Sequence, residues 1–292
     1  MPHQQPVVPV QTADGHVFEL IRVPAAGASK RLLFLPGMGL SARQYIDFGQ
    51  ALARRGVEVF IHEWRGIGSS SLRADRRHDW GYAELLQQDL DAALNAMSCD
   101  DDGQGCIIGG HSLGSQLACL LAAMRPEACA GVLIVAGGSP YWRQFSGWMR
   151  WILATMFVGM PALSGLLGHY PGRRLGFAGR EARGVIRDWT ASGRSGRYAP
   201  KGLTVDLESG LRALEVPTLA IHMQDDWFVP QASLTWLLTK LSSSPISQST
   251  LDGRRLQGTA DHYRWMREPE PAVERIGQWL QCFGEIKTNN QT

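Results

Sequence analysis

Gly110-His111-Ser112-Leu113-Gly114 is the stretch of sequence that decides the fold. It lies between a short apolar run at residues 106–110 and a segment at residues 113–124 whose apolar residues recur at helical spacing. A G-x-S-x-G turn between a strand and a helix is the nucleophile elbow, which holds its serine in a strained backbone conformation and exposes the hydroxyl. Glycine is needed at 110 and 114 because side chains there would collide with the neighbouring helix and strand. The alternative is a purely structural turn at Ser112.

Apolar runs and helical periods alternate on both sides of this motif. Apolar or β-branched runs predict strands at residues 17–23, 31–35, 57–62, 106–110, 132–136, 217–222 and 246–251. Apolar residues three and four apart predict helices at residues 42–55, 83–97, 113–124 and 231–241 and a last helix that begins at 269. Strands that alternate with helices predict a mostly parallel sheet that is covered on both faces.

Composition and charge exclude several classes of protein. Of the 292 residues, 44% are hydrophobic and 19% are charged, which excludes an intrinsically disordered chain. The length allows one α/β domain or two. The formal net charge of +2 is too balanced for a dedicated nucleic-acid binder, so we expect no nucleic-acid partner.

The cysteines and the first residues indicate the compartment. Cys99, Cys106, Cys119, Cys129 and Cys282 show neither a CxxC motif nor metal-type spacing, so no metal site is expected. Three of them, at 106, 119 and 129, lie in apolar stretches and are expected to be core thiols. The first fourteen residues lack the apolar segment of a secretory signal. We therefore expect a cytoplasmic protein.

The elbow in its strand–helix context resembles the α/β-hydrolase family, and the resemblance extends over about residues 30–283. It implies the α/β-hydrolase fold: a mostly parallel, doubly wound sheet with a helical cap insertion. The stretch Pro36-Gly37-Met38-Gly39 resembles the His-Gly-x-Gly turn of the family, with Pro36 in place of the usual histidine. The resemblance implies that the backbone N–H groups of Met38 and Leu113 form an oxyanion hole, and it implies no cofactor.

A second stretch resembles a structural part of the same family. His62-Glu63-Trp64-Arg65-Gly66-Ile67-Gly68-Ser69 is similar to the family's Asp-x-Arg-Gly-x-Gly-x-Ser, with Glu63 in place of the aspartate. We assign these residues no catalytic role.

The order of catalytic residues in this fold is serine, then acid, then histidine. The strand predicted at 217–222 leads into Asp225-Asp226-Trp227-Phe228-Val229-Pro230. The family pattern places the acid two residues ahead of a Val-Pro pair, which selects Asp226. Asp225 is then a second carboxylate that caps or hydrogen-bonds in the turn, and it stays open as an alternative acid.

His262 is the only histidine after Asp226, and it precedes the last predicted helix, where the family places its base. The family often has glycine before this histidine, whereas this chain has Asp261, which stays open as a competitor for the imidazole. His111 within the elbow is usually a packing residue. We predict that Ser112 is the nucleophile, Asp226 the acid and His262 the base.

The strand–helix alternation breaks at residues 139–208, where this family places its cap. We therefore expect an α/β core at 1–138 and 209–292 and a cap insertion at 139–208. Residues 151–167 carry no charge, but 17 residues are the bare minimum for a membrane span and glycines and a proline interrupt them. We expect instead a cap that lines an apolar acyl pocket. The motif Ser139-Pro140-Tyr141-Trp142 resembles a little-characterised bacterial branch, which implies no known substrate.

The chain has 25 arginines against 4 lysines, and the cap holds a cluster of them. The arginines of the cluster are Arg173, Arg174, Arg180, Arg183, Arg187, Arg194 and Arg197. One interpretation is a solvated cap face. The other is an anionic partner: a membrane surface, a phosphate-bearing acyl carrier or a carboxylated substrate.

These features together predict a serine hydrolase. Its substrate is expected to be a small-molecule or carrier-bound carboxylic ester or thioester with an apolar acyl group. The same residues would serve an acyltransferase, and a non-catalytic ligand-binding homologue is a further alternative. Residues 37–42 also imitate the G-x-G-x-x-A fingerprint of a dinucleotide site, with Glu63 as its acid, but that interpretation leaves Ser112 and His262 unexplained.

Overall fold

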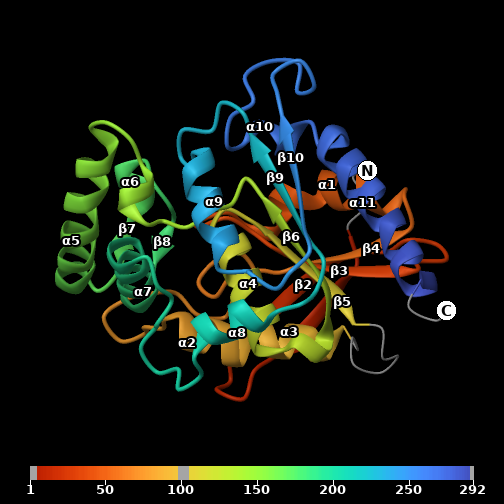
Figure 1. The fold of residues 1–292 in the computed structure, drawn as a ribbon. Coiled ribbons are helices and arrows are strands. Elements are labelled where there is room, and N and C mark those ends of the chain that lie inside the picture. The colour runs from red at the N-terminus through yellow and green to blue at the C-terminus, as the bar shows by residue number, and fades with distance from the viewer. Residues whose placement is uncertain (1–4, 98–104, 290–292) are drawn as a thin grey trace.

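The computed structural model describes residues 5–97 and 105–289, with side chains described up to residue 282. Within these residues an eight-stranded sheet lies at the centre with helices on both faces (Figure 1). The strands lie side by side in the order β1 (Val7–Gln11), β2 (Val17–Val23), β4 (Val57–Ile61), β3 (Lys30–Leu35), β5 (Cys106–His111), β6 (Cys129–Val135), β9 (Thr218–Met223) and β10 (Ile246–Leu251). The β1–β2 and β2–β4 pairs are antiparallel and the other pairs are parallel. The predicted fold class is confirmed.

All seven predicted strands are present, with ends that shift by up to three residues. The sequence did not predict β1, an edge strand that contains Pro9. Proline cannot donate to the ladder and is therefore tolerated on an edge strand but is no signal for one. Only Val10 of this strand is buried, so the strand also shows no apolar periodicity.

Each face of the sheet has its own apolar core. Leu32 and Phe34 of β3 point to one face and Leu33 and Leu35 to the other, and all four are buried. The face of Leu33 and Leu35 is covered by α2 (Tyr82–Glu84), η2 (Leu85–Leu90), α3 (Asp91–Ala96), α4 (Leu113–Met124), α8 (Leu207–Ala213) and α9 (Gln231–Thr239). The other face is covered by η1 (Ala42–Tyr45), α1 (Ile46–Ala53), α10 (Arg264–Arg267) and α11 (Glu270–Asn289).

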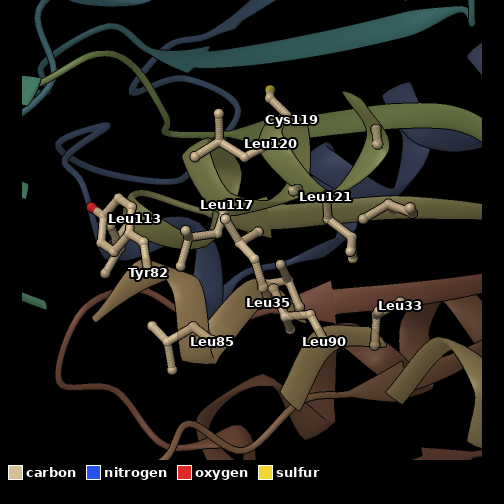
Figure 2. Close-up of a cluster of buried hydrophobic side chains, with 14 of the residues drawn as sticks. Leu33, Leu35, Tyr82, Leu85, Leu90, Leu113, Leu117, Cys119, Leu120 and Leu121 are labelled. Carbon is tan, nitrogen blue, oxygen red and sulfur yellow. The ribbon is translucent and has the colours of Figure 1, made fainter. Parts of the chain in front are cut away.

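Figure 2 shows how α4 packs on the sheet. Leu113, Leu117 and Leu121 of this helix lie near Leu35 of β3 and Leu90 of η2. The predicted helix at 42–55 begins with the 3₁₀ turn η1, and the predicted helix at 83–97 contains the π-helical segment η2. The motif at residues 110–114 lies between β5, which is buried throughout, and the packed helix α4.

The segment between β6 and α8 contains the cap elements. These are η4 (Trp142–Gln144), α5 (Met149–Leu167), β7 (Tyr170–Pro171), α6 (Gly172–Leu175), β8 (Arg180–Glu181) and α7 (Arg183–Ser195). Helix α5 lies at the outer edge of the molecule and packs on α7 (Figure 1). The rings of Phe157 in α5 and Trp189 in α7 pack edge to face with their centroids 5.1 Å apart. Both side chains belong to the same apolar core as α4.

By length and composition α5 could cross a membrane, and only 17% of its most apolar window is buried. Its inner side nevertheless packs on α7. Cys106, Cys119 and Cys129 are buried thiols, as expected, whereas Cys282 is exposed and Cys99 lies outside the described residues.

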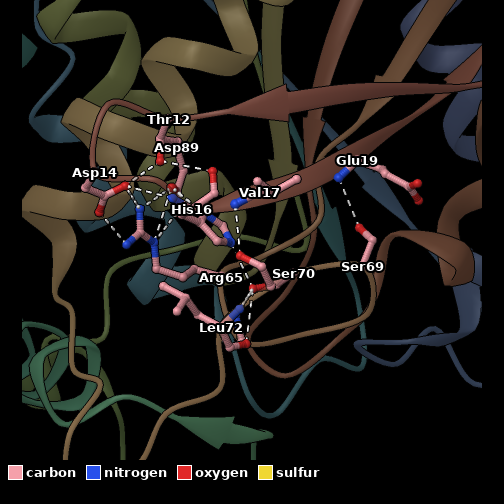
Figure 3. Close-up of polar contacts among 12 residues, drawn as sticks. Thr12, Asp14, His16, Val17, Glu19, Arg65, Ser69, Ser70, Leu72 and Asp89 are labelled. Carbon is pink, nitrogen blue, oxygen red and sulfur yellow. Dashed lines mark hydrogen bonds and ion pairs between the residues drawn. The ribbon is translucent and has the colours of Figure 1, made fainter.

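A buried polar cluster joins the N-terminal hairpin to the stretch at 62–69 (Figure 3). Arg65 donates from Nη2 to Asp89 at 2.6 Å and from Nη1 to Asp14 at 2.7 Å. His16 lies 2.9 Å from Asp89 through Nδ1 and 2.8 Å from the Ser70 hydroxyl through Nε2. Burial alone would raise the pKa of Asp89, but the hydrogen bonds from His16 and Arg65 outweigh it and hold the pKa below its usual value. The stretch at 62–69 is therefore a structural anchor.

The Asp89→Asn substitution is expected to lower the free energy of unfolding by about 3–5 kcal/mol, because it removes the buried one of the two carboxylates that pair with the Arg65 guanidinium and leaves only the partly exposed Asp14. Asp91→Asn is the matched control, because its partly exposed pair with Arg125 should contribute less than about 1 kcal/mol. Urea unfolding followed by circular dichroism measures both. Equal losses in the two variants would contradict this account of the cluster.

Candidate functional site

Ser112 occupies the turn between β5 and α4 with φ 54° and ψ −116°, a conformation that non-glycine residues rarely adopt. Two glycines make the turn possible. A Cβ at Gly110 would lie 2.3 Å from the backbone of Gly114, and one at Gly114 would lie 2.0 Å from the carbonyl oxygen of Leu35. The structure thus places the serine where the sequence predicts a strained elbow, at the N-terminus of a buried helix.

Met38 and Leu113 line one cavity together with Ser112. Among the residues that the structure describes, neither backbone N–H donates a hydrogen bond to the protein. The loop of Met38 is held from both sides. The Gly37 N–H donates to the Tyr45 hydroxyl at 2.9 Å, and a Cβ at Gly39, where φ is +76°, would lie 2.3 Å from the backbone nitrogen of Gly179 in the cap.

His262 and Asp226 form a buried pair. His262 Nδ1 lies 2.7 Å from Asp226 Oδ2. The other carboxylate oxygen, Oδ1, accepts the backbone N–H groups of Phe228 and Val229, each at 2.9 Å. The carboxylate is therefore fixed by its own turn and aimed at the imidazole.

The other two carboxylates that the sequence left open have different partners. Asp225 accepts the Ala260 N–H at 2.9 Å and so joins the two loops. Asp261 accepts the backbone N–H groups of Tyr263 and Arg264 and caps the turn that precedes α10. Of the three carboxylates, the structure brings Asp226 to the imidazole.

Sequence reasoning missed Tyr45 and assigned His111 only to packing. The Tyr45 hydroxyl lies 2.8 Å from His111 Nδ1, and His111 Nε2 lies 3.1 Å from the carbonyl oxygen of His262. Burial holds the pKa of His111 well below its usual value, so the ring is neutral. Because a carbonyl only accepts, Nε2 carries the proton and Tyr45 donates to Nδ1. These hydrogen bonds form a relay, through Tyr45 and His111, that links the loop of Gly37 to the backbone of His262.

The cavity above Ser112 has a volume of about 370 Å³. Its walls come from the core loops, from the starts of α4 and α9, from α5 and α7, and from residues 176–178, which follow α6. None of the described residues that line it is Asp, Glu, Lys or Arg. Aromatic and apolar side chains from the cap and from the acid loop dominate the lining: Phe145, Trp148, Met149, Ile152, Leu153, Met156, Phe157, Phe177, Trp189, Trp227 and Phe228.

A titratable carboxyl lies behind the loop of Met38. Glu181 of the cap borders Met38, Gly39 and Leu113 and accepts the Gly179 N–H at 2.8 Å. Burial raises the pKa of Glu181 to about 7. Nothing in the sequence around Glu181 signals this placement, because it depends on how the cap folds back onto the core.

Glu63, the acid that a dinucleotide site would need, accepts the Ala42 N–H at 3.0 Å and so braces the adjacent loop. Among the described residues, no group of three or more His, Cys, Asp or Glu side chains is arranged to hold a metal ion.

Comparison with known proteins also points to hydrolases. A family model described as "Serine aminopeptidase, S33" matches residues 27–255. The polyketide synthase ThaQ of Burkholderia thailandensis is 32% identical over 109 residues, which make up 37% of this chain and 5% of ThaQ. The monoglyceride lipase of Rattus norvegicus is 27% identical over 125 residues, 42% of this chain and 40% of the lipase. The chain thus matches less than half the length of either curated relative.

Among solved structures, a thermophilic esterase from Thermogutta terrifontis superposes with a TM-score of 0.61. The match covers 95% of this chain and 99% of the esterase at 17% identity. At that identity the likeness shows a shared fold.

The Tyr45→Phe substitution is expected to lower the free energy of unfolding by about 1–3 kcal/mol, because it leaves the Gly37 N–H and His111 Nδ1 without a partner in a buried site. Tyr82→Phe is the matched control, since the buried Tyr82 hydroxyl makes no hydrogen bond among the described residues. Chemical denaturation of both variants is the measurement. A Tyr45→Phe protein as stable as the Tyr82→Phe protein would show that the relay contributes nothing.

Proposed function

Because the chain belongs to the serine aminopeptidase S33 family of α/β-hydrolases, we propose that it is a serine hydrolase that cleaves carboxylic esters or thioesters with an apolar acyl group. In this proposal Ser112 is the nucleophile, His262 the base and Asp226 the acid. The N–H groups of Met38 and Leu113 form the oxyanion hole.

The uncharged cavity is the observation that carries the choice of substrate. Ser112 and His262 line the same space as the apolar side chains of the cap, and no described Asp, Glu, Lys or Arg lines it. An aminopeptidase substrate brings an ammonium group, which is costly to bury without a carboxylate partner. An alkyl or aryl acyl chain carries no such penalty and gains by leaving water. The likeness to a monoglyceride lipase supports an ester of this kind.

The proposed reaction begins when His262 Nε2 takes the proton of the Ser112 hydroxyl while Oγ attacks the acyl carbonyl carbon. Asp226 holds the proton on Nδ1 of His262 and stabilises the imidazolium that forms. The developing oxyanion accepts from the N–H groups of Met38 and Leu113, and each such donor contributes about 10²–10³ in rate. The helix dipole at the start of α4 favours the same negative charge.

The tetrahedral intermediate then collapses. The bond to the leaving alcohol or thiol breaks, the leaving group takes the proton from His262, and the acyl group remains on Ser112 as an ester. A water molecule that gives its proton to His262 attacks this ester, the bond to Ser112 Oγ breaks as His262 returns the proton to that oxygen, and the carboxylic acid is released. If an alcohol or amine attacks instead, the same residues perform acyl transfer.

A panel of p-nitrophenyl esters and acyl thioesters of increasing chain length tests the proposal. We expect turnover that rises from acetyl to longer acyl groups, because the cavity gains apolar contacts with each added methylene. The Ser112→Ala protein should lose about 10⁶ in kcat. The proposal would be contradicted if the protein turned over none of these substrates, or if its Ser112→Ala variant retained full activity.

The Asp226→Asn substitution is expected to lower kcat by about 10⁴, because an amide can stabilise the wrong tautomer of His262 and cannot stabilise its charged form. Asp225→Asn and Asp261→Asn are the matched controls, since within the described part of the chain these carboxylates accept only backbone N–H groups. Steady-state kinetics with the best ester of the panel measures all three. A loss of activity at Asp225 or Asp261 as large as at Asp226 would contradict the assignment of the acid.

A further inference from the structure

Helix α5 presents an uncharged face to the outside of the molecule. We call it the outer face of α5, and it consists of the exposed residues Trp151, Thr155, Val158, Gly159, Ala162, Gly165 and Leu166. Its largest side chains, Trp151, Val158 and Leu166, are 64%, 66% and 70% exposed. Thr155 is the one polar residue among them, and its hydroxyl donates to the carbonyl of Ile152 at 2.8 Å. A contiguous apolar patch of this kind marks an interaction surface.

The outer face of α5 is continuous with the mouth of the cavity. Leu153, Met156 and Phe157 on the inner side of the helix line the cavity above Ser112. Trp148, which precedes the helix, both lines the cavity and is 68% exposed. Trp227, in the loop that follows Asp226, also lines the cavity and is also exposed. The helix therefore separates the apolar cavity from its apolar exterior, and exposed tryptophans mark the opening.

The stretch of chain that contains α5 carries charge of one sign. Residues 128–180 contain no Asp or Glu but contain five arginines. Arg143 precedes α5, and Arg173 and Arg174 follow it; all three are exposed. Among the described residues, the side chains of Arg173 and Arg174 form no ion pair or hydrogen bond.

The rest of the arginine cluster of the cap is largely taken up inside the protein. Arg180 donates to the carbonyl of Ala74 and Arg194 to that of Phe157. Arg183 pairs with Asp79, and Arg187 pairs with Asp188. An internal structural role therefore accounts for these four. Of the other three, Arg197 follows α7, whereas Arg173 and Arg174 lie beside α5 and are available to an anionic partner.

We propose that the outer face of α5, with the arginines at its ends, docks onto the surface of an anionic lipid bilayer. The apolar side chains would enter the boundary between headgroups and acyl chains, and Arg173 and Arg174 would lie at headgroup phosphates. A second copy of the chain is a poorer occupant, because two-fold pairing of antiparallel α5 helices would bring arginines against arginines. Docking does not depend on the hydrolase proposal, although it would place the cavity mouth beside lipid substrates.

Co-sedimentation with vesicles tests the proposal. The full-length Ser112→Ala protein serves as the parent, so that no lipid is consumed. We expect it to bind phosphatidylcholine vesicles that contain phosphatidylglycerol and to bind pure phosphatidylcholine vesicles much less. Arg173→Gln and Arg174→Gln should each weaken binding about fivefold.

Val158→Glu in the same parent should weaken binding by about tenfold or more, since it removes an exposed valine that would enter the bilayer and adds a charge at the interface. Val205→Glu is the matched control, because Val205 is 49% exposed but lies outside α5 and should leave binding unchanged. Thermal melting checks that both variants remain folded.

Two results would overturn the proposal. One is binding to anionic vesicles that is absent from the parent or unaffected by Val158→Glu. The other is a parent that is dimeric by analytical ultracentrifugation, does not bind vesicles and becomes monomeric with Val158→Glu, which would identify a second copy as the occupant. Because the readout needs no turnover, it stands or falls separately from the hydrolase activity.

Discussion

The turn at Ser112 is the constraint on which the rest of the site depends. A non-glycine residue at φ 54° is stable only where its surroundings leave it no alternative. Here β5 ends between β3 and β6 at the centre of the sheet, and α4 must start at once, because Gly114 lies against the carbonyl of Leu35. The geometry fixes the serine hydroxyl and the Leu113 N–H together. Any side chain at 110 or 114 would push strand and helix apart.

The residues proposed to act with Ser112 lie near one another because parallel strands end at the same edge of the sheet. Asp226 follows β9, His262 follows β10, and Met38 follows β3. The relay through Tyr45 and His111 then ties two of these loops together below the cavity. The site is thus held by hydrogen bonds between buried side chains and the backbone of the loops, with the cap placed over it.

The turn at Ser112, the helices and the buried strands could be predicted because their signals are local, in residues that are close together along the chain. The order of acid and histidine joins distant segments, and its prediction rested on the resemblance to the family. Tyr45, Glu181 and the pairing of Arg65 with Asp89 escaped prediction because each depends on contacts between distant segments. Edge strand β1 escaped because Pro9 and a single buried valine carry no strand signal. The cap arginines could not be sorted from sequence, since only the fold shows which of them have partners.

The central claim is that the strained turn makes Ser112 a nucleophile that His262 and Asp226 activate. Labelling with a fluorophosphonate probe, followed by mass spectrometry of peptides, tests it most directly, because the probe reacts with activated serines. The account predicts a single adduct on Ser112 that disappears in His262→Ala, while Ser115, three residues further along, stays unlabelled. An adduct on another serine, or labelling of Ser112 that persists at the same rate without His262, would contradict it.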